Sequence, residues 1–140
     1  MKIISHRGNL NGRDLSNENN PSHVLKILET YDVEIDAWYK DNKWFLGHDE
    51  PKYEITREFF KTGMWVHCKN IEAVQKLNFT RINYFWHEND KMTLTGNGYI
   101  WCYPGVYVKS GITVELEYKQ NLPDFILGVC TDYPLLYSRK

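Results

Sequence analysis

The sequence of 140 residues lacks any apolar run of about 20 residues, the length that a helix needs to cross a bilayer. Its first residues show no signal-peptide pattern. The net charge is −1 and charges of both signs are mixed along the chain, so there is no electrostatic footprint for nucleic acid. We therefore expect a cytoplasmic protein that binds neither nucleic acid nor a membrane.

Cysteine is scarce, and internal repeats and low-complexity segments are absent. Cys68, Cys102 and Cys130 are odd in number, and each lies in a strand-like run. This pattern predicts buried thiols in a reducing compartment, not a disulfide framework. The length suggests a single domain over residues 1–140, and a hydrophobic content of 42% with 15% aromatics is enough for a real core.

Strands and helices alternate in the first part of the chain. Residues 2–5 and 33–38 read as strands, and between them Asn20 is a typical cap for a helix over 21–30 with one apolar stripe. Such a unit has the size of a βαβ motif, so its strands should be parallel, with adjacent carboxyl ends. We also expect a helix at 71–77, capped by Asn70, and a loop with a short helical turn at 51–60. Further strands are expected at 43–47, 64–69, 82–86, 92–95, 99–102, 112–116 and 125–130.

Polar residues gather where these strands end. His6 and Arg7 follow the first strand, and Glu34 and Asp36 lie two apart, so they share one face of the second strand. Two buried carboxylates repel each other unless a cation or a proton neutralises them, and a hard divalent ion is a natural partner. The alternative is that both acids are solvated on an edge strand and that His48, after the next turn, is a loop histidine.

Several short motifs, taken in order, resemble the glycerophosphodiester phosphodiesterase family, which belongs to the phospholipase C-like phosphodiesterases built on TIM-type barrels. The match covers residues 1–70 well and 99–134 more thinly, with Asn17-Glu18-Asn19 only a loose match. The motifs are His6-Arg7-Gly8, Glu34-Ile35-Asp36, His48-Asp49, Val66-His67-Cys68-Lys69, Ile100-Trp101-Cys102 and Thr131-Asp132-Tyr133-Pro134.

The resemblance implies a metal-dependent phosphodiesterase that hydrolyses a small phosphodiester such as a glycerophosphodiester. His6 and His48 would act as general acid and base, a role suited to imidazole near neutral pH. Glu34 and Asp36 would hold Mg²⁺ or Ca²⁺, with the family's third ligand falling on His67. Arg7 and Lys69 would neutralise the phosphate, which is the expected small-molecule partner.

Two departures from the family pattern carry consequences. Imidazole at His67 suits Mn²⁺ or Zn²⁺ better than Ca²⁺, unless His67 contacts only the substrate or another ligand. Glu88 is an alternative source of the missing oxygen, whereas His87 reads as a loop histidine. The second departure is length, because barrels of this type use about 250 residues.

The short chain therefore predicts an α/β fold, a small or incomplete TIM-type (β/α) barrel with several outer helices missing. Its outer apolar surface would need cover, and the many aromatic residues would supply that cover or a homodimer contact. A second hypothesis is a non-catalytic phosphate-binding or interaction module on a decayed barrel. A third, an enzyme that cleaves phospholipid head groups, is disfavoured because no apolar helix for membrane docking is evident.

Overall fold

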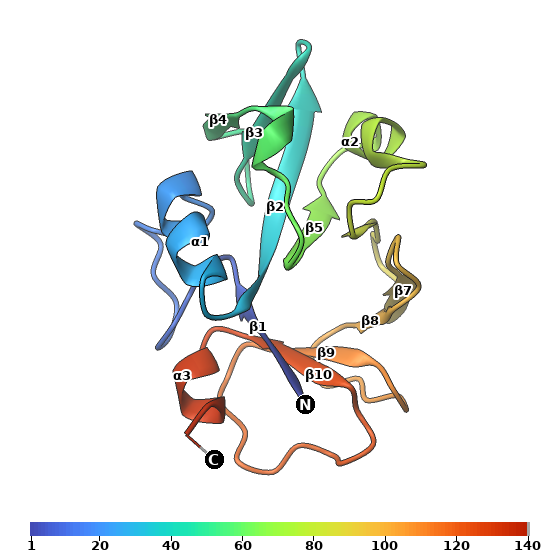
Figure 1. Cartoon of the computed structure of the whole chain (residues 1–140). Helices are drawn as coiled ribbons and strands as arrows, with labels where there is room; N and C mark the ends of the chain where they lie inside the picture. Colours follow the sequence, from blue (N-terminus) through green and yellow to red (C-terminus); the bar gives the residue numbers. More distant parts are fainter. Residues whose placement is uncertain (140) are drawn as a thin grey trace.

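The protein is a curled ten-stranded sheet with few helices, seen in a computed structural model that describes residues 1–139 (Figure 1). The strands are β1 Lys2–His6, β2 Asp32–Lys40, β3 Lys43–Leu46, β4 Tyr53–Ile55, β5 Met64–Cys68, β6 Tyr84–Phe85, β7 Met92–Leu94, β8 Ile100–Cys102, β9 Ile112–Glu115 and β10 Gly128–Thr131. The helices are α1 Pro21–Leu28, α2 Ile71–Leu77 and α3 Pro134–Tyr137, with one 3₁₀ turn, η1 Arg57–Phe59.

Parallel pairing joins most of the strands, in the order β6-β5-β2-β1-β10-β9-β8. The pairs β2–β3, β3–β4 and β7–β8 are antiparallel. The register places His6 opposite Glu34 and Asp36 opposite His67. The predicted parallel arrangement of the first two strands is confirmed.

The two ends of the sheet approach each other. The Gly96 amide donates to the Tyr84 carbonyl over 2.6 Å, and the Thr93 hydroxyl donates to the Trp86 carbonyl over 3.0 Å. These bonds connect the segment of β6 with the segment of β7, which pairs with β8 at the other end of the order. The fold is thus mixed α/β, and a curled sheet with few helices is compatible with the expected incomplete barrel.

The two predicted helices begin at the predicted caps. Asn20 Oδ1 accepts from the His23 amide, and Asn70 Oδ1 accepts from the Ala73 amide. Each helix buries a short apolar stripe against the convex side of β2 and β5, where the larger of two core clusters lies. No helix among residues 1–139 is both long and apolar enough to span a bilayer.

A second core cluster fills the inside of the curl. Its buried members come one each from six parallel strands and are Ile4, Trp65, Phe85, Trp101, Ile112 and Cys130. Side chains alternate between the two faces of a strand. The same strands therefore carry one set of residues to the helices and another to this inner core. The three cysteines are all buried, as predicted.

Three element predictions need correction. The segment 51–60 contains strand β4 as well as a helical turn, because it pairs with β3. The predicted strand at 125–130 begins only at Gly128, and Phe125 is 51% exposed. The strand expected at 82–86 is reduced to β6, and the short helix α3 was not predicted.

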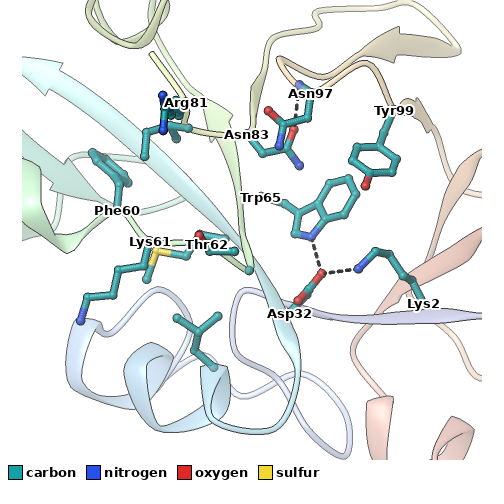
Figure 2. A pocket seen from close by; sticks show the side chains of 14 residues that line it. Lys2, Asp32, Phe60, Lys61, Thr62, Trp65, Arg81, Asn83, Asn97 and Tyr99 are labelled. Atoms are coloured by element: carbon teal, nitrogen blue, oxygen red, sulfur yellow. Dashed lines mark hydrogen bonds and ion pairs between the residues drawn. The ribbon is translucent and has the colours of Figure 1, made fainter.

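An open hollow of about 690 Å³ lies at the amino-terminal ends of the strands (Figure 2). Lys2 Nζ and Trp65 Nε1 both contact Asp32 Oδ2, at 3.1 and 3.0 Å. This hollow is larger than the cavity described next, but the predicted site residues lie at the opposite ends of the strands. The volume of a cavity therefore does not by itself identify the one that holds the predicted site residues.

Candidate functional site

A cavity of about 300 Å³ lies at the carboxyl-terminal ends of the strands, the end of parallel α/β folds where ligands bind. Six of the seven predicted site residues line it: His6, Arg7, Glu34, His48, His67 and Lys69. The seventh, Asp36, is fully buried and lies within 4 Å of Arg7, His67 and Lys69. The structure thus brings all seven predicted residues to one place.

Glu34 and Asp36 share the concave face of β2, as their spacing predicted, and both side chains are buried. Neither is the solvated edge residue of the alternative interpretation. Glu34 Oε2 and Asp36 Oδ1 are buried and accept no hydrogen bond from the described residues. Buried carboxylate oxygens without such partners are costly, so the pair is suited to a cation.

The two carboxylates differ in their surroundings. Burial and the neighbouring Asp36 carboxylate raise the pKa of Glu34 to about 7. Burial would also raise the pKa of Asp36, but the contact with His67 and the charge of Arg7 outweigh it and hold that pKa well below its usual range. Near neutral pH, Asp36 is therefore ionised, and Glu34 is partly protonated.

His6 is held by a carboxylate on the side away from Glu34. Its Nδ1 lies 2.7 Å from Asp132 Oδ1, and its Nε2 lies 3.8 Å from Glu34 Oε2. Burial lowers the pKa of His6, but the hydrogen bond to Asp132 and the charge of Glu34 outweigh burial, so the pKa is raised. Nδ1 therefore serves as the anchoring donor, and Nε2 is the nitrogen directed at the carboxylate pair.

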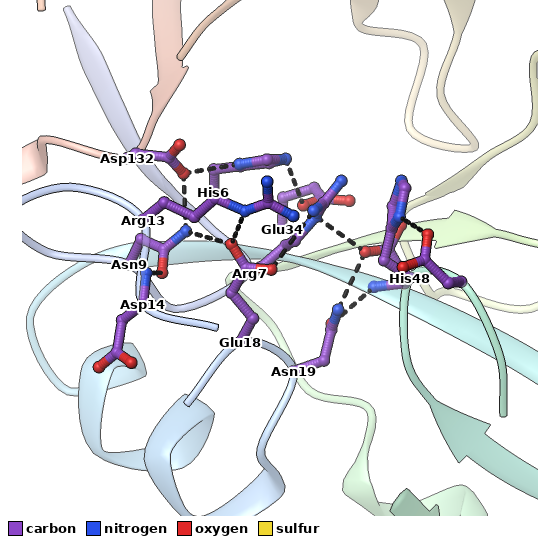
Figure 3. A network of polar contacts seen from close by, with 12 residues as sticks. His6, Arg7, Asn9, Arg13, Asp14, Glu18, Asn19, Glu34, His48 and Asp132 are labelled. Atoms are coloured by element: carbon purple, nitrogen blue, oxygen red, sulfur yellow. Dashed lines mark hydrogen bonds and ion pairs between the residues drawn. The ribbon is translucent and has the colours of Figure 1, made fainter. Parts of the chain in front are cut away.

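Arg7 joins the carboxylate pair to the loop before α1 (Figure 3). Its Nε lies 3.1 Å from Asp36 Oδ2, and its Nη1 donates to Glu18 Oε2 over 3.4 Å. Asn19 donates to Asp36 Oδ2 over 3.0 Å and accepts from the Asp36 amide over 2.9 Å. Arg7 is therefore held by buried partners, and its own side chain is only 12% exposed.

His48 stands at the cavity mouth, on the turn after β3. Its Nδ1 lies 2.7 Å from Asp49 Oδ1, and its side chain is 39% exposed. Because this contact occupies Nδ1, Nε2 is the ring nitrogen of His48 that remains available for proton transfer. Gly47 allows the turn, since a Cβ there would meet the Glu50 carbonyl oxygen at 2.0 Å.

His67 completes a three-residue cluster. Its Nδ1 lies 3.2 Å from Asp36 Oδ1 and 3.9 Å from Glu34 Oε1. One ligand atom from each of these residues lies within 4.8 Å of the others. Burial lowers the pKa of His67, despite the Asp36 contact, so the ring is neutral and able to bind a metal near pH 7.

This cluster fits a divalent ion. It offers two carboxylates and one imidazole, a donor set that suits Mn²⁺, Zn²⁺ or Mg²⁺. The buried oxygens without hydrogen-bond donors supply an independent reason for a cation at this point. Glu88 lines the same cavity but is not part of the cluster, so its suggested role as an oxygen ligand has no geometric support among the described residues.

Sequence reasoning missed several residues that complete the site. His87 was read as a loop histidine, but it lines the cavity and stacks on His67 with ring centroids 4.7 Å apart. Burial and the nearby charges lower the pKa of His87 to about 4. Its position after β6, another parallel strand end, was the signal that could have identified it.

The polar residues behind the cavity were also missed. Asn9 Nδ2 donates to both Glu18 Oε1 and Asp132 Oδ1, at 3.0 and 2.7 Å, so it connects the partners of Arg7 and His6. Glu18 and Asn19 lie in the motif that matched only loosely, and Asp132 lies in the closing motif. A polar loop before a capped helix gave a weak signal, because such loops are usually solvated.

Comparisons with known proteins add no relative. No protein-family model matches the chain, and neither curated proteins nor solved structures gave a match.

Proposed function

We propose that this chain is a metal-dependent phosphodiesterase on an incomplete TIM-type barrel, acting on a small phosphodiester such as a glycerophosphodiester. One observation supports it above all others. The cavity holds His6 and His48, each paired with its own carboxylate. Beside them lies a buried carboxylate pair, two of whose oxygens accept no hydrogen bond from the described residues. A site that only binds phosphate has no need for two imidazoles oriented in this way.

In this proposal, Glu34, Asp36 and His67 hold the metal ion. When bound, the ion supplies positive charge beside a non-bridging phosphate oxygen. Arg7 and Lys69 line the same cavity and provide the remaining positive charge for the phosphate. The Arg7 guanidinium is already paired with the carboxylates of Asp36 and Glu18. The Lys69 ammonium, 3.9 Å from Asp36 Oδ1, is therefore more available to bind the phosphate.

The two histidines divide the proton transfers. His6 has a raised pKa and keeps its proton, so it acts as general acid toward the leaving alcohol oxygen. Asp49 engages Nδ1 of His48, so Nε2 accepts the proton of the attacking hydroxyl. The exposure of His48 at the cavity mouth suits a base that meets either water or a hydroxyl of the substrate.

The test is a hydrolysis assay with an aryl phosphodiester in Mg²⁺, Ca²⁺, Mn²⁺ and Zn²⁺. His6→Ala and His48→Ala should each lose about 100-fold or more of the metal-dependent rate. His23→Gln is the matched control, since His23 contacts the Gly8 carbonyl outside the cavity lining, and it should keep the rate. Absence of turnover in a folded protein with every metal would leave the non-catalytic binding module as the better account.

A further inference from the structure

The cavity has two unlike halves. β1, β2 and β5, with His48 on the turn after β3, contribute most of its histidines and carboxylates. β6, β8, β9 and the residues that follow β8 and β9 contribute an apolar wall, at the border of which His87 and Glu88 follow β6. This wall is made of Phe85, Trp101, Tyr103, Pro104, Val114 and Leu116. A phosphate in the first half therefore directs one of its ester groups toward the second.

The apolar wall begins directly beside the metal cluster. Phe85 stacks on His67 with ring centroids 4.9 Å apart, and Trp101 stacks on Phe85 at 4.5 Å. Phe85 and Trp101 are buried and form the floor, whereas Tyr103 and Leu116 are exposed at the rim. An ester group next to the bound phosphate thus meets ring and methyl surfaces first.

Few polar atoms on this wall are free to bind a substrate hydroxyl. The Tyr103 hydroxyl donates to the backbone carbonyl of Glu88 over 2.9 Å, so its one proton is already used. The His87 and Tyr103 rings meet edge to face, with centroids 5.0 Å apart. His87 Nδ1 is buried and has no hydrogen-bond partner among the described residues, so this one atom can pair with a single substrate hydroxyl. A hydroxyl-rich alcohol would lose its water here without full compensation, and each hydroxyl left unpaired would weaken binding.

We infer that the ester group seated on this wall is a small apolar alcohol, alkyl or aryl, and not a polyol such as glycerol. This inference rests on the proposed phosphodiesterase function and concerns only the ester group on the wall side, so the glycerol of a glycerophosphodiester would be the other ester group. A volume of about 300 Å³ is at the lower end for ligand pockets, so a long acyl chain does not fit inside.

The experiment measures binding, independently of turnover, by calorimetry with Mn²⁺ present. The ligands are n-propyl phosphate and glycerol 3-phosphate, which have the same three-carbon chain and phosphate but differ in two hydroxyls. We expect n-propyl phosphate to bind at least 5-fold more tightly. Equal affinities, or tighter binding of glycerol 3-phosphate, would overturn the inference.

Variants test whether the wall causes the preference. Leu116→Asn should reduce the preference by about 3-fold, whereas Leu127→Asn should leave it unchanged. Leu127 is a matched control because it is 37% exposed, against 39% for Leu116, and lies outside the cavity. Val114→Thr, which adds a hydroxyl with little change of shape, gives a second measurement if Leu116→Asn unfolds. A preference that persists in both folded wall variants contradicts the inference.

The outcomes separate the two proposals. Hydrolysis of the aryl diester with equal binding of the two monoesters would retain the phosphodiesterase and reject the apolar alcohol. If neither monoester binds in the presence of Mn²⁺ and no diester is hydrolysed, both proposals fail together.

Discussion

Asp132 determines the state of His6 although it does not line the cavity. The 2.7 Å contact between Asp132 Oδ1 and His6 Nδ1 orients the ring and favours its protonated form. Asn9 holds the same Asp132 oxygen from the other side. A buried carboxylate that accepts from two such donors keeps its position. His6 Nε2, the nitrogen that would transfer the proton in the proposed reaction, is therefore held in place.

Asp132→Asn should therefore lower the pKa of His6. The amide keeps the shape but removes the negative charge that favours imidazolium. In the variant, His6 loses its proton at a lower pH, and the alkaline limb of activity moves in the same direction. NMR titration of the His6 ring signals measures the shift directly. Asp41→Asn, at an exposed turn aspartate, is the control, and an unmoved His6 titration in Asp132→Asn would refute the role of Asp132.

In the proposed metal site, His67 is the ligand that would determine which metal is preferred. An imidazole nitrogen suits Mn²⁺ and Zn²⁺, whereas a third carboxylate suits Mg²⁺ and Ca²⁺. His67→Glu should therefore move the preference toward Mg²⁺ or Ca²⁺, with an affinity for Zn²⁺ about 10-fold or more lower. Calorimetry with each metal measures this change. If the order of affinities is the same in both proteins, His67 is not a ligand.

At the scale of elements, the turn after β3 places His48 at the cavity mouth. Gly47 has a φ of +154°, and a Cβ on it would lie 2.0 Å from the Glu50 carbonyl oxygen. The turn also receives a hydrogen bond, because Trp38 Nε1 donates to the Gly47 carbonyl over 2.7 Å. The position of His48 thus depends on a backbone path that only glycine permits.

Gly47→Ala should displace the 48–50 turn and reduce the hydrolysis rate about 10-fold or more, since small misplacements of a catalytic group are costly. Stability should fall by about 1–3 kcal/mol. Gly98→Ala is the matched control: Gly98 also has a positive φ, but open space surrounds its Cβ position. Urea unfolding and the aryl phosphodiester assay measure both effects. Comparable rates in the two variants would show that the turn does not position His48.

Local patterns in the sequence were sufficient for most elements. Asn20 and Asn70 are side-chain caps whose effect is confined to one helical turn, so α1 and α2 could be predicted almost to the residue. Glu34 and Asp36 follow the two-residue period of a strand, so their common face could be predicted as well. Strand β4 could not, because three residues become a strand only by pairing with β3.

At the scale of the whole molecule, the contacts that complete the site are long-range. Asp132 meets His6 across 126 positions because β10 pairs with β1, and periodicity within a segment does not encode which strands become neighbours. The closure between β6 and β7 likewise depends on bonds from Thr93 and Gly96 to carbonyls of the other strand segment. The buried network behind the motifs could therefore be found only once the strand neighbours were known from the fold.

The carboxylate pair also connects the site to the stability of the entire fold. Burial and Asp36 raise the pKa of Glu34 from 4.5 to about 7, so the metal-free protein is most favoured with Glu34 protonated. The contribution of protonated Glu34 to the free energy of unfolding is fully present below pH 4.5 and is lost as the pH rises through 7. A bound divalent ion replaces the proton, so metal binding should restore stability where the proton is lost.

Two measurements on the whole protein test this relation. Mn²⁺ affinity should rise by about 10-fold per pH unit below pH 7, with release of one proton, and level off above it.

Glu34→Gln, which keeps the shape without the charge, should raise the metal-free unfolding free energy at pH 8 by ~2 kcal/mol and abolish stabilisation by Mn²⁺. Urea unfolding with and without Mn²⁺ at pH 4, 6 and 8 measures both quantities. Glu54→Gln, at a solvent-exposed acid on β4, should change neither. Mn²⁺ stabilisation that survives in Glu34→Gln would place the ion elsewhere and remove the basis of the proposed metal site.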